Sequence, residues 1–312
     1  MRTPRRRWRS AVLSLTVIAA ATLLTGCGSG AAPSKADDAY TLAVQSGPVA
    51  SAADIPAGSW MDKIRKRGYL RVGGTQTSPL FSYKNPLTGR TTGFDTGLSQ
   101  MLAHYITGGT DLNSLTQQTD VTVDTRESLL RNGTVDAVFA TYTMTPARAE
   151  QVAFAGPYYE SGDAIMVKAG NTSIRGVADL DGRTVATESN STSALSLAKY
   201  APGAKVLLFS NDAQCVAAVQ QGRADAYVLD QGILLSDASA NTAVKVVGQP
   251  FTQEPYGIGL PHGDSQAVRF VDSWLQKIIA DGSWARLWQA TIGQATRTTQ
   301  PAPPVVGSVP EA

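Results

Sequence analysis

The chain has 312 residues, of which 43% are apolar and 17% charged, so it is long enough to bury a large core in one or two domains. Its 27 Lys and Arg against 25 Asp and Glu give a net charge of +2, but five of the arginines lie within the first nine residues. Without those five, 22 basic and 25 acidic residues leave a net charge of −3, so nothing favours nucleic acid as a partner.

The N-terminus has the features of a secretory signal. Arginines at positions 2, 5, 6, 7 and 9 precede an apolar run from Ala11 to Leu24 that is shorter than the roughly twenty residues needed to cross a bilayer. The sequence Leu24-Thr-Gly-Cys27 resembles a bacterial lipobox, in which the cysteine is acylated and becomes the new N-terminus. We therefore expect residues 1–26 to be a lipoprotein signal peptide and Cys27 to carry lipid. A secreted protein with a chance cysteine is the alternative.

Two segments lack the periodicity of helices or strands. Residues 28 to 58 are rich in Gly, Ala, Ser and Pro, and the end of the chain after Arg297 is rich in Pro. We expect residues 27–59 to be a flexible tether between membrane and domain, and residues 298–312 to be a flexible tail.

Between these segments, short β-branched runs alternate with runs of helical period. Strands are predicted at Leu70–Val72, Val135–Ala140, Val206–Phe209 and Ala224–Leu229, and helices at Phe94–Tyr105, Pro146–Gln151 and Ala213–Gln221. Such alternation favours parallel α/β sheets. Ligands of open α/β sheets bind where strands end and helices begin, so we expect functional residues at the helix starts.

One predicted helix start lies at Asp124. Asp124 and Glu127 have the spacing of a capping box, and Gly133 would end the helix. This places Arg126 at the second helical position, where the partial positive charge of the helix N-terminus disfavours a cation.

A second start lies at Thr145, predicted as an N-cap with Pro146 at the first helical position and Arg148 at the third. An anionic ligand would compensate for both Arg126 and Arg148. A solvated surface arginine is the alternative for either residue alone. Two such arginines, each just after a predicted strand, favour a binding site.

The remaining reactive residue types are few. If Cys27 carries lipid, Cys215 has no disulfide partner, and we expect it to be a small buried side chain, with a reactive thiol as the alternative. The two histidines, His104 and His262, have no obvious metal partner, and the sequence contains no hydrolase or thiol-redox motif. We therefore expect no bound metal, no cofactor and no enzymatic activity.

Ordered sequence blocks carry a family resemblance from about Met61 to Gly293. The blocks are Arg67–Gly73, Thr92–Asp95, Asn132–Asp136, Val135–Tyr159, Asp179–Ala186, Ala224–Asp230 and Pro255–Pro261. They resemble the bacterial extracellular solute-binding proteins of family 3, the amino-acid-binding class, and especially its glutamate, aspartate and glutamine binders.

The resemblance implies an α/β, two-lobe, periplasmic-binding-protein-like fold of class II, with a ligand cleft between lobes joined by two crossover strands. Residues 60–163 plus 257–297 would form the first lobe and residues 164–256 the second. It also implies an amino acid as the small-molecule ligand, an ABC permease and ATPase as partners, a monomer, and an extracytoplasmic location on the outer face of the cell membrane. Closure is expected because neither lobe alone satisfies both ends of a zwitterion.

Four site residues of the first lobe are implied by their positions in these blocks. Arg148 matches the arginine that binds the ligand α-carboxylate through a bidentate pair. Thr143 matches the threonine beside it, and the Thr141 carbonyl falls where the family accepts from the α-amino group. Phe81 matches a stretch that supplies an aromatic wall, with plain core packing as an equal alternative.

Three site residues of the second lobe are implied in the same way. Asp230 matches the aspartate that pairs with the ligand ammonium. Ser191 and Thr192 match the loop that donates to the carboxylate from the opposite wall.

Arg126 is expected to decide which side chain is bound. It matches the arginine that faces the distal carboxylate in acidic-amino-acid binders, which favours glutamate or aspartate over glutamine or asparagine. Val123 and Leu229 depart from the polar residues common in acidic binders. A glutamine or asparagine binder stays open as an alternative, as does an extracellular sensor or partner-binding protein of the same fold.

Overall fold

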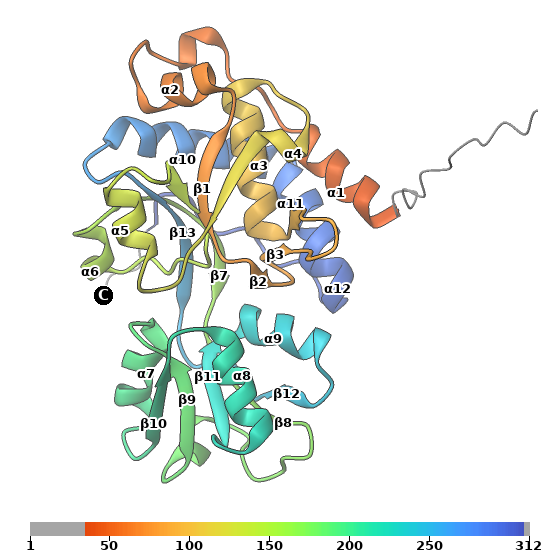
Figure 1. Ribbon diagram of the computed structural model, residues 1–312, viewed down its shortest axis with the longest axis vertical. Helices are drawn as coiled ribbons and strands as arrows, with labels where there is room; N and C mark the ends of the chain where they lie inside the picture. Colours follow the sequence, from red (N-terminus) through yellow and green to blue (C-terminus); the bar gives the residue numbers. More distant parts are fainter. Residues whose placement is uncertain (1–34, 309–312) are drawn as a thin grey trace, which may run out of the picture. The chain divides into compact units, whose positions relative to one another are not determined.

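The computed structural model describes residues 35–308, so the predicted signal peptide and Cys27 lie outside the described range. Two five-stranded sheets organise these residues (Figure 1). We call the part of the chain built on the first sheet lobe 1 and the part built on the second sheet lobe 2. Within residues 35–308 no helix is long and apolar enough to cross a membrane.

The first sheet has the spatial order β5 (Thr116–Asp120), β1 (Leu70–Gly74), β6 (Ala137–Val138), β13 (Glu254–Leu260) and β7 (Ala153–Ser161). The second has the order β10 (Lys205–Phe209), β9 (Thr184–Glu188), β11 (Ala226–Asp230), β8 (Asp163–Lys168) and β12 (Val244–Val247). A small antiparallel sheet of β2 (Thr77–Ser78), β3 (Ser82–Lys84) and β4 (Thr91–Thr92) belongs to lobe 1.

Both large sheets combine the expected parallel pairs with antiparallel ones. The predicted strands β1, β6, β10 and β11 all take part in parallel pairs: β1 pairs with β6 and with β5, while β10 and β11 both pair with β9. One strand of each sheet, β13 or β8, runs antiparallel to its neighbours. These are the strands by which the chain enters each lobe from the other, so their direction is set by the crossing and not by a crossover helix.

Helices cover both faces of each sheet. Lobe 1 contains α1 (Lys35–Gln45), α2 (Trp60–Arg67), α3 (Phe94–Thr107), α4 (Leu112–Leu115), α5 (Arg126–Arg131), α6 (Pro146–Ala149), α10 (Ser265–Ala280), α11 (Ser283–Trp288) and α12 (Gln294–Thr296), with the turns η1 (Ala52–Asp54) and η3 (Gln289–Gly293). Lobe 2 contains η2 (Val177–Leu180), α7 (Thr192–Tyr200), α8 (Asp212–Gln221) and α9 (Gln231–Ala240).

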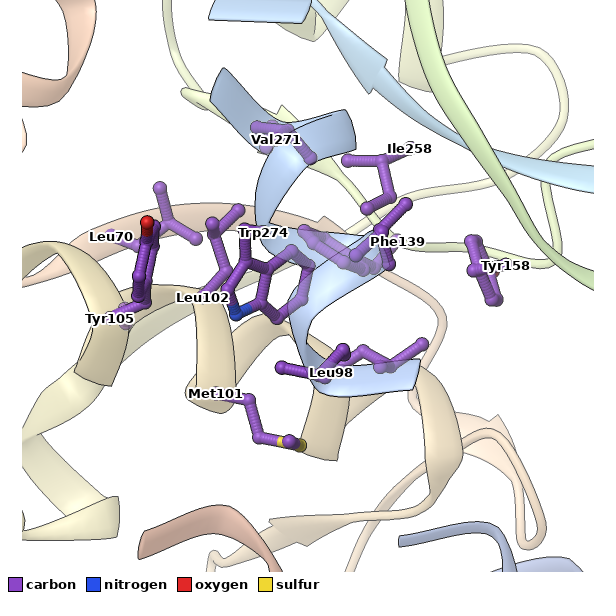
Figure 2. Packing of buried hydrophobic residues seen from close by; sticks show 14 of the residues in the cluster. Leu70, Leu98, Met101, Leu102, Tyr105, Phe139, Tyr158, Ile258, Val271 and Trp274 are labelled. Atoms are coloured by element: carbon purple, nitrogen blue, oxygen red, sulfur yellow. The ribbon is translucent and has the colours of Figure 1, made fainter. Parts of the chain in front are cut away.

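The largest core lies on one face of the first sheet. Figure 2 shows Trp274 of α10 close to Leu98, Met101 and Leu102 of α3, all of them buried. Burial of large side chains at this density supplies most of the free energy that holds α3 and α10 against the sheet. On one face of the second sheet, Cys215 of α8 is fully buried, as predicted, and burial raises the pKa of its thiol.

Helix α1 corrects the expected tether. Tyr40, Ala43 and Val44 are buried in the core of lobe 1, and the Tyr40 hydroxyl donates to Gln100 Oε1 at 2.7 Å. The spacing of these three residues places them on one face of a helix, a signal that the Ala- and Ser-rich composition obscures. Residues 35–59 are therefore largely part of the folded lobe.

The described part of the C-terminal tail also contacts lobe 1. Gly307 N donates to Gly156 O at 2.8 Å, and Val306 packs against the large core. The tail lacks helix and strand up to residue 308, as its composition predicts, but these contacts contradict a free tail.

The chain crosses between the lobes twice, from β7 to β8 through Gly162 and from β12 to β13 through residues 248–253. The two crossings touch: the Thr252 hydroxyl accepts from Asp163 N at 2.7 Å. The lobe boundaries predicted from the sequence, 163/164 and 256/257, fall near these crossings.

We expect Gly162→Ala to destabilise the fold by about 1–3 kcal/mol, because overpacking against backbone cannot be relieved by a side-chain rotation. A Cβ atom at this position would lie 2.3 Å from Thr252 O. Denaturation in urea measures the change. Gly170→Ala is the matched control, since a Cβ there meets nothing within 4 Å. Equal urea midpoints for Gly162→Ala and Gly170→Ala would contradict the close approach of the two crossings.

Candidate functional site

A cavity of about 230 Å³ is lined by both lobes. A second cavity of about 30 Å³ adjoins it and shares Val123, Arg126, Thr141, Glu188 and Ile233 with it. We call the larger one the distal cavity and the smaller one the inner cavity. Seven of the eight residues expected to bind ligand line the inner cavity: Arg126, Thr141, Thr143, Arg148, Ser191, Thr192 and Asp230.

Arg148 is positioned by the helix start predicted from Thr145 and Pro146, which the structure confirms. The Thr145 hydroxyl accepts from Arg148 N at 3.3 Å, and Pro146 is the first residue of α6. The guanidinium donates to Thr143 O at 2.9 Å, which directs it back along the chain that forms the cavity wall. Burial lowers the pKa of Arg148.

The capping box predicted at Asp124 is wrong. Helix α5 begins at Arg126 with Thr125 as its N-cap, so Arg126 is the first helical residue. The Asp124 carboxylate instead accepts from Asn190 Nδ2 of lobe 2 at 2.6 Å, and Glu127 accepts from the Tyr142 hydroxyl at 2.8 Å. Each carboxylate makes a longer-range hydrogen bond that replaces the local one.

Arg126 is buried, with 4% of its surface exposed. Its Nη1 donates to Ala140 O at 3.2 Å, while its Nε has no hydrogen-bond partner among the described residues. Burial, and after it the charge of Arg148, lowers the pKa of Arg126 to about 10. A buried cation with unused donors is costly unless an acceptor is supplied.

Thr141 has a left-handed backbone with φ of +44°, which is uncommon for a β-branched residue. Its N–H donates to Asp95 Oδ2 at 2.8 Å, and Tyr158 donates to the other oxygen of Asp95 at 2.8 Å. Burial raises the pKa of Asp95 to about 6. This buried carboxyl fixes the turn that brings Thr141 and Thr143 to the cavity.

The lobe 2 residues lie at the ends of β9 and β11. Ser191 is the N-cap of α7, where its hydroxyl accepts from Ala194 N at 3.1 Å and donates to Glu188 O at 2.7 Å. Thr192 is the first residue of the same helix. Asp230 ends β11; its Oδ1 is buried without a partner, and burial raises its pKa well above the ordinary value.

Glu188 lines both cavities, and it is the most important site residue that the sequence analysis did not identify. Burial, and then the charge of Asp212, raises the pKa of Glu188 to about 7, while Arg126 acts in the opposite direction. Glu188 is the last residue of β9, so the rule that ligands bind at strand ends could have identified it. Asp212 also lines the distal cavity and accepts from the Tyr227 hydroxyl at 2.9 Å.

Thr75 is a further residue that sequence reasoning missed. It lines the distal cavity just after β1, and its buried hydroxyl has no hydrogen-bond partner among the described residues. Its place after a strand is again the only sequence signal.

Phe81 is not brought to the site, which corrects its expected role as a wall. It lines neither cavity and is fully buried, with its ring edge-on to Tyr159 and Tyr256 at centroid distances of 5.4 and 5.9 Å. A Cβ on Gly232 of lobe 2 would lie 2.8 Å from this ring. Phe81 therefore packs in the core, close to where α9 approaches lobe 1.

Known proteins share this architecture. The chain is 36% identical to the glutamine-binding protein of Geobacillus stearothermophilus, over 79% of this chain and 90% of the relative. It is 34% identical to the ABC transporter glutamine-binding protein GlnH of Bacillus subtilis, over 73% and 83%. The solved structure of an ancestral arginine-binding protein bound to glutamine superposes with a TM-score of 0.66 at 34% identity, over 73% of this chain and 99% of that one.

Residues 70–294 match the family model described as bacterial extracellular solute-binding proteins, family 3. The match covers well over half of the chain and includes both sheets, the two crossings and every residue that lines the inner cavity. The chain therefore belongs to the bacterial extracellular solute-binding proteins of family 3.

Proposed function

We propose that the protein binds glutamine between its lobes, and glutamate less tightly at neutral pH, and delivers the amino acid to a membrane permease. The observation that carries the proposal is the arrangement of buried ionisable groups, with one arginine and one carboxyl group in the inner cavity and a second such pair on the wall that the two cavities share. Arg148 and Asp230 line the inner cavity, and Arg126 and Glu188 line both cavities.

The inner cavity suits the α-amino and α-carboxylate groups. Arg148 offers a planar set of donors for a carboxylate, and Asp230 offers a buried acceptor without a partner on one oxygen. Each of these charges is costly when buried without its complement. The zwitterionic end of a free amino acid supplies both complements at once, with Thr143 and Thr192 as further polar contacts.

The distal cavity suits an amide better than a carboxylate. An amide accepts through its oxygen and donates through its nitrogen, so it can pair with Arg126 and Glu188 together. A ligand carboxylate would pair with Arg126 but would face Glu188 and Asp212, which carry the same charge. Arg126 alone favours an acidic ligand. The presence of Glu188 beside it shifts the expected ligand preference toward glutamine. The glutamine binding named for both relatives agrees with this preference.

The proposal extends to import and anchorage. The B. subtilis relative is named as part of an ABC transporter, which supports an ABC permease and ATPase as partners of this chain. We propose that Cys27 is acylated after removal of residues 1–26, because of the basic, apolar and small-residue order that precedes it. The protein would then act as a monomer held to the outer face of the cell membrane.

Calorimetry of residues 28–312 against the twenty amino acids tests the proposed ligand. We expect glutamine to give heat, and Arg148→Ala to weaken its binding about a hundredfold or more, because loss of one partner leaves a buried charge unpaired. Arg131→Ala is the matched control, since Arg131 is an exposed arginine of α5 that lines neither cavity. Circular dichroism checks that both variants fold. No heat from any amino acid would rule the proposal out.

The ratio of glutamate to glutamine affinity should depend on pH. Because the pKa of Glu188 is about 7, its negative charge is lost as pH falls from 8 to 6, and glutamate binding should strengthen relative to glutamine by about tenfold. The other charges that act on Glu188 are Asp212, Arg126 and Asp124.

Glu188→Gln should remove this pH dependence and keep at pH 8 the higher relative affinity for glutamate that the wild type shows at pH 6, because the repelling charge is absent. The two ligands are titrated calorimetrically at pH 6, 7 and 8 for both proteins. If the variant keeps the wild-type ratio and its pH dependence, Glu188 does not face the distal group of the ligand.

Expression of the full chain in a bacterium that acylates lipoproteins tests the anchor. We expect the wild type in the membrane fraction with a fatty-acid label, and Cys27→Ala unlabelled and soluble. Cys215→Ala is the control, because that cysteine is buried inside lobe 2 and should leave the label unchanged. Retention of the label in Cys27→Ala would contradict acylation at this position.

A further inference from the structure

Tyr142 lies against both arginines of the proposed site, although it lines neither cavity. The Cζ atom of Arg126 is 3.9 Å from the centroid of the Tyr142 ring, and that of Arg148 is 5.3 Å away. Tyr142 is fully buried. A single aromatic ring thus contacts two cations that the proposed function requires to stay close together.

These two cations repel each other. Arg148 is the second largest cause, after burial, of the lowered pKa of Arg126. Neither guanidinium forms an ion pair within residues 35–308. Each donates one hydrogen bond to a backbone carbonyl, Ala140 O for Arg126 and Thr143 O for Arg148. The backbone carbonyls, together with carboxylates outside ion-pair distance such as Glu127, compensate only part of the repulsion between two like charges in a buried site.

The ring face can supply that compensation. The face of an aromatic ring carries negative potential and attracts a guanidinium within about 6 Å. A carboxylate in the same place would occupy the N–H donors, and a ligand would have to displace it. A ring face attracts the cation without accepting from a particular N–H, so the donors stay available.

The ring itself is held firmly. Its hydroxyl donates to Glu127 Oε1 at 2.8 Å, and Phe154 packs edge-on against it at a centroid distance of 4.7 Å. On another side, a Cβ at Gly259 would come within 3.1 Å of the ring, so only glycine leaves it normal space. Glu127 also adds a negative charge that acts on both arginines.

We infer that Tyr142 is a positioning residue for ligand binding: its ring holds Arg126 and Arg148 side by side and leaves the N–H donors that do not bond the backbone free for a ligand. The inference rests on the proposed function for its ligand. Its structural part, the contact of the ring with both guanidinium groups, can be measured without any ligand.

Tyr142→Leu and Tyr142→Phe separate the ring face from the hydroxyl. We expect Tyr142→Leu to weaken glutamine binding by about tenfold or more, since two desolvated cation–π contacts are lost. Tyr142→Phe keeps the face and should stay within about threefold of the wild type. Phe270→Leu is the matched control, because it removes an aromatic ring that packs on Tyr105 in the large core of lobe 1 and lines neither cavity. Calorimetry gives the affinities, and thermal unfolding reports any loss of stability.

The energetic coupling between Tyr142 and Arg126 is a readout that a loss of packing alone would not change. In an Arg126→Met background the effect of Tyr142→Leu should shrink to about threefold or less, because the ring then has one cation left to hold. An undiminished effect in that background would overturn the inference. So would a Tyr142→Phe variant as weak as Tyr142→Leu, or a Phe270→Leu variant that loses as much affinity as Tyr142→Leu.

NMR of the ligand-free protein distinguishes the two proposals. The Nε–H signals of Arg126 and Arg148 should show ring-current shifts that persist in Tyr142→Phe and vanish in Tyr142→Leu. Absence of these shifts in the wild type overturns the inference even if glutamine binds. If the wild type shows these ring-current shifts but binds no amino acid, the result contradicts the proposed function and leaves the inference about Tyr142 standing.

Discussion

The structure depends on burying charges of both signs on two separate lobes without neutralising them inside either lobe. Asp230 is a buried carboxyl of lobe 2 with one unpartnered oxygen, and Arg126 is a buried cation of lobe 1 with an unused donor. Burial of such groups costs several kcal/mol each in a site without a complement. The fold tolerates them because the rest of each lobe is a well-packed α/β layer structure, and the proposed zwitterionic ligand would supply their complements.

The strand ends explain why these groups converge. In each lobe the parallel strands end at one edge, and the residues that follow begin helices or turns. Arg126 and Ser191 both stand at helix starts, while Glu188 and Asp230 are the last residues of β9 and β11. The two crossings place these edges opposite each other. Polar groups at strand ends therefore become the walls of one cleft.

Local sequence signals predicted well those features whose partners are local. The N-cap at Thr145 bonds a residue three positions away, and the strands of β-branched residues formed as expected. The two-lobe α/β fold followed from ordered blocks that span most of the chain. Seven of the eight expected ligand-binding residues line one cavity.

Features with distant partners were the ones that local patterns missed. Asp124 had a local capping partner in the sequence but bonds Asn190, 66 residues later. Glu188 gains its significance from Arg126, which lies on the other lobe. The sequence favours a ligand-contacting wall and core packing equally for Phe81, and only the close approach of Gly232 in the structure identifies it as core. The composition of residues 28 to 58 indicates a flexible segment, whereas the spacing of the three buried residues of α1 indicates a helix.

Both described ends of the chain belong to the same lobe. Helix α1 packs into the core of lobe 1, and the tail returns to it through Gly307 and Gly156, so lobe 2 is a continuous insertion between β7 and β13. A rotation of lobe 2 about the two crossings therefore leaves the distance between residues 35 and 308 unchanged. If Cys27 carries the proposed lipid, lobe 2 can open and close without pulling on that attachment, and the free energy of closure would be independent of tension in the proposed link.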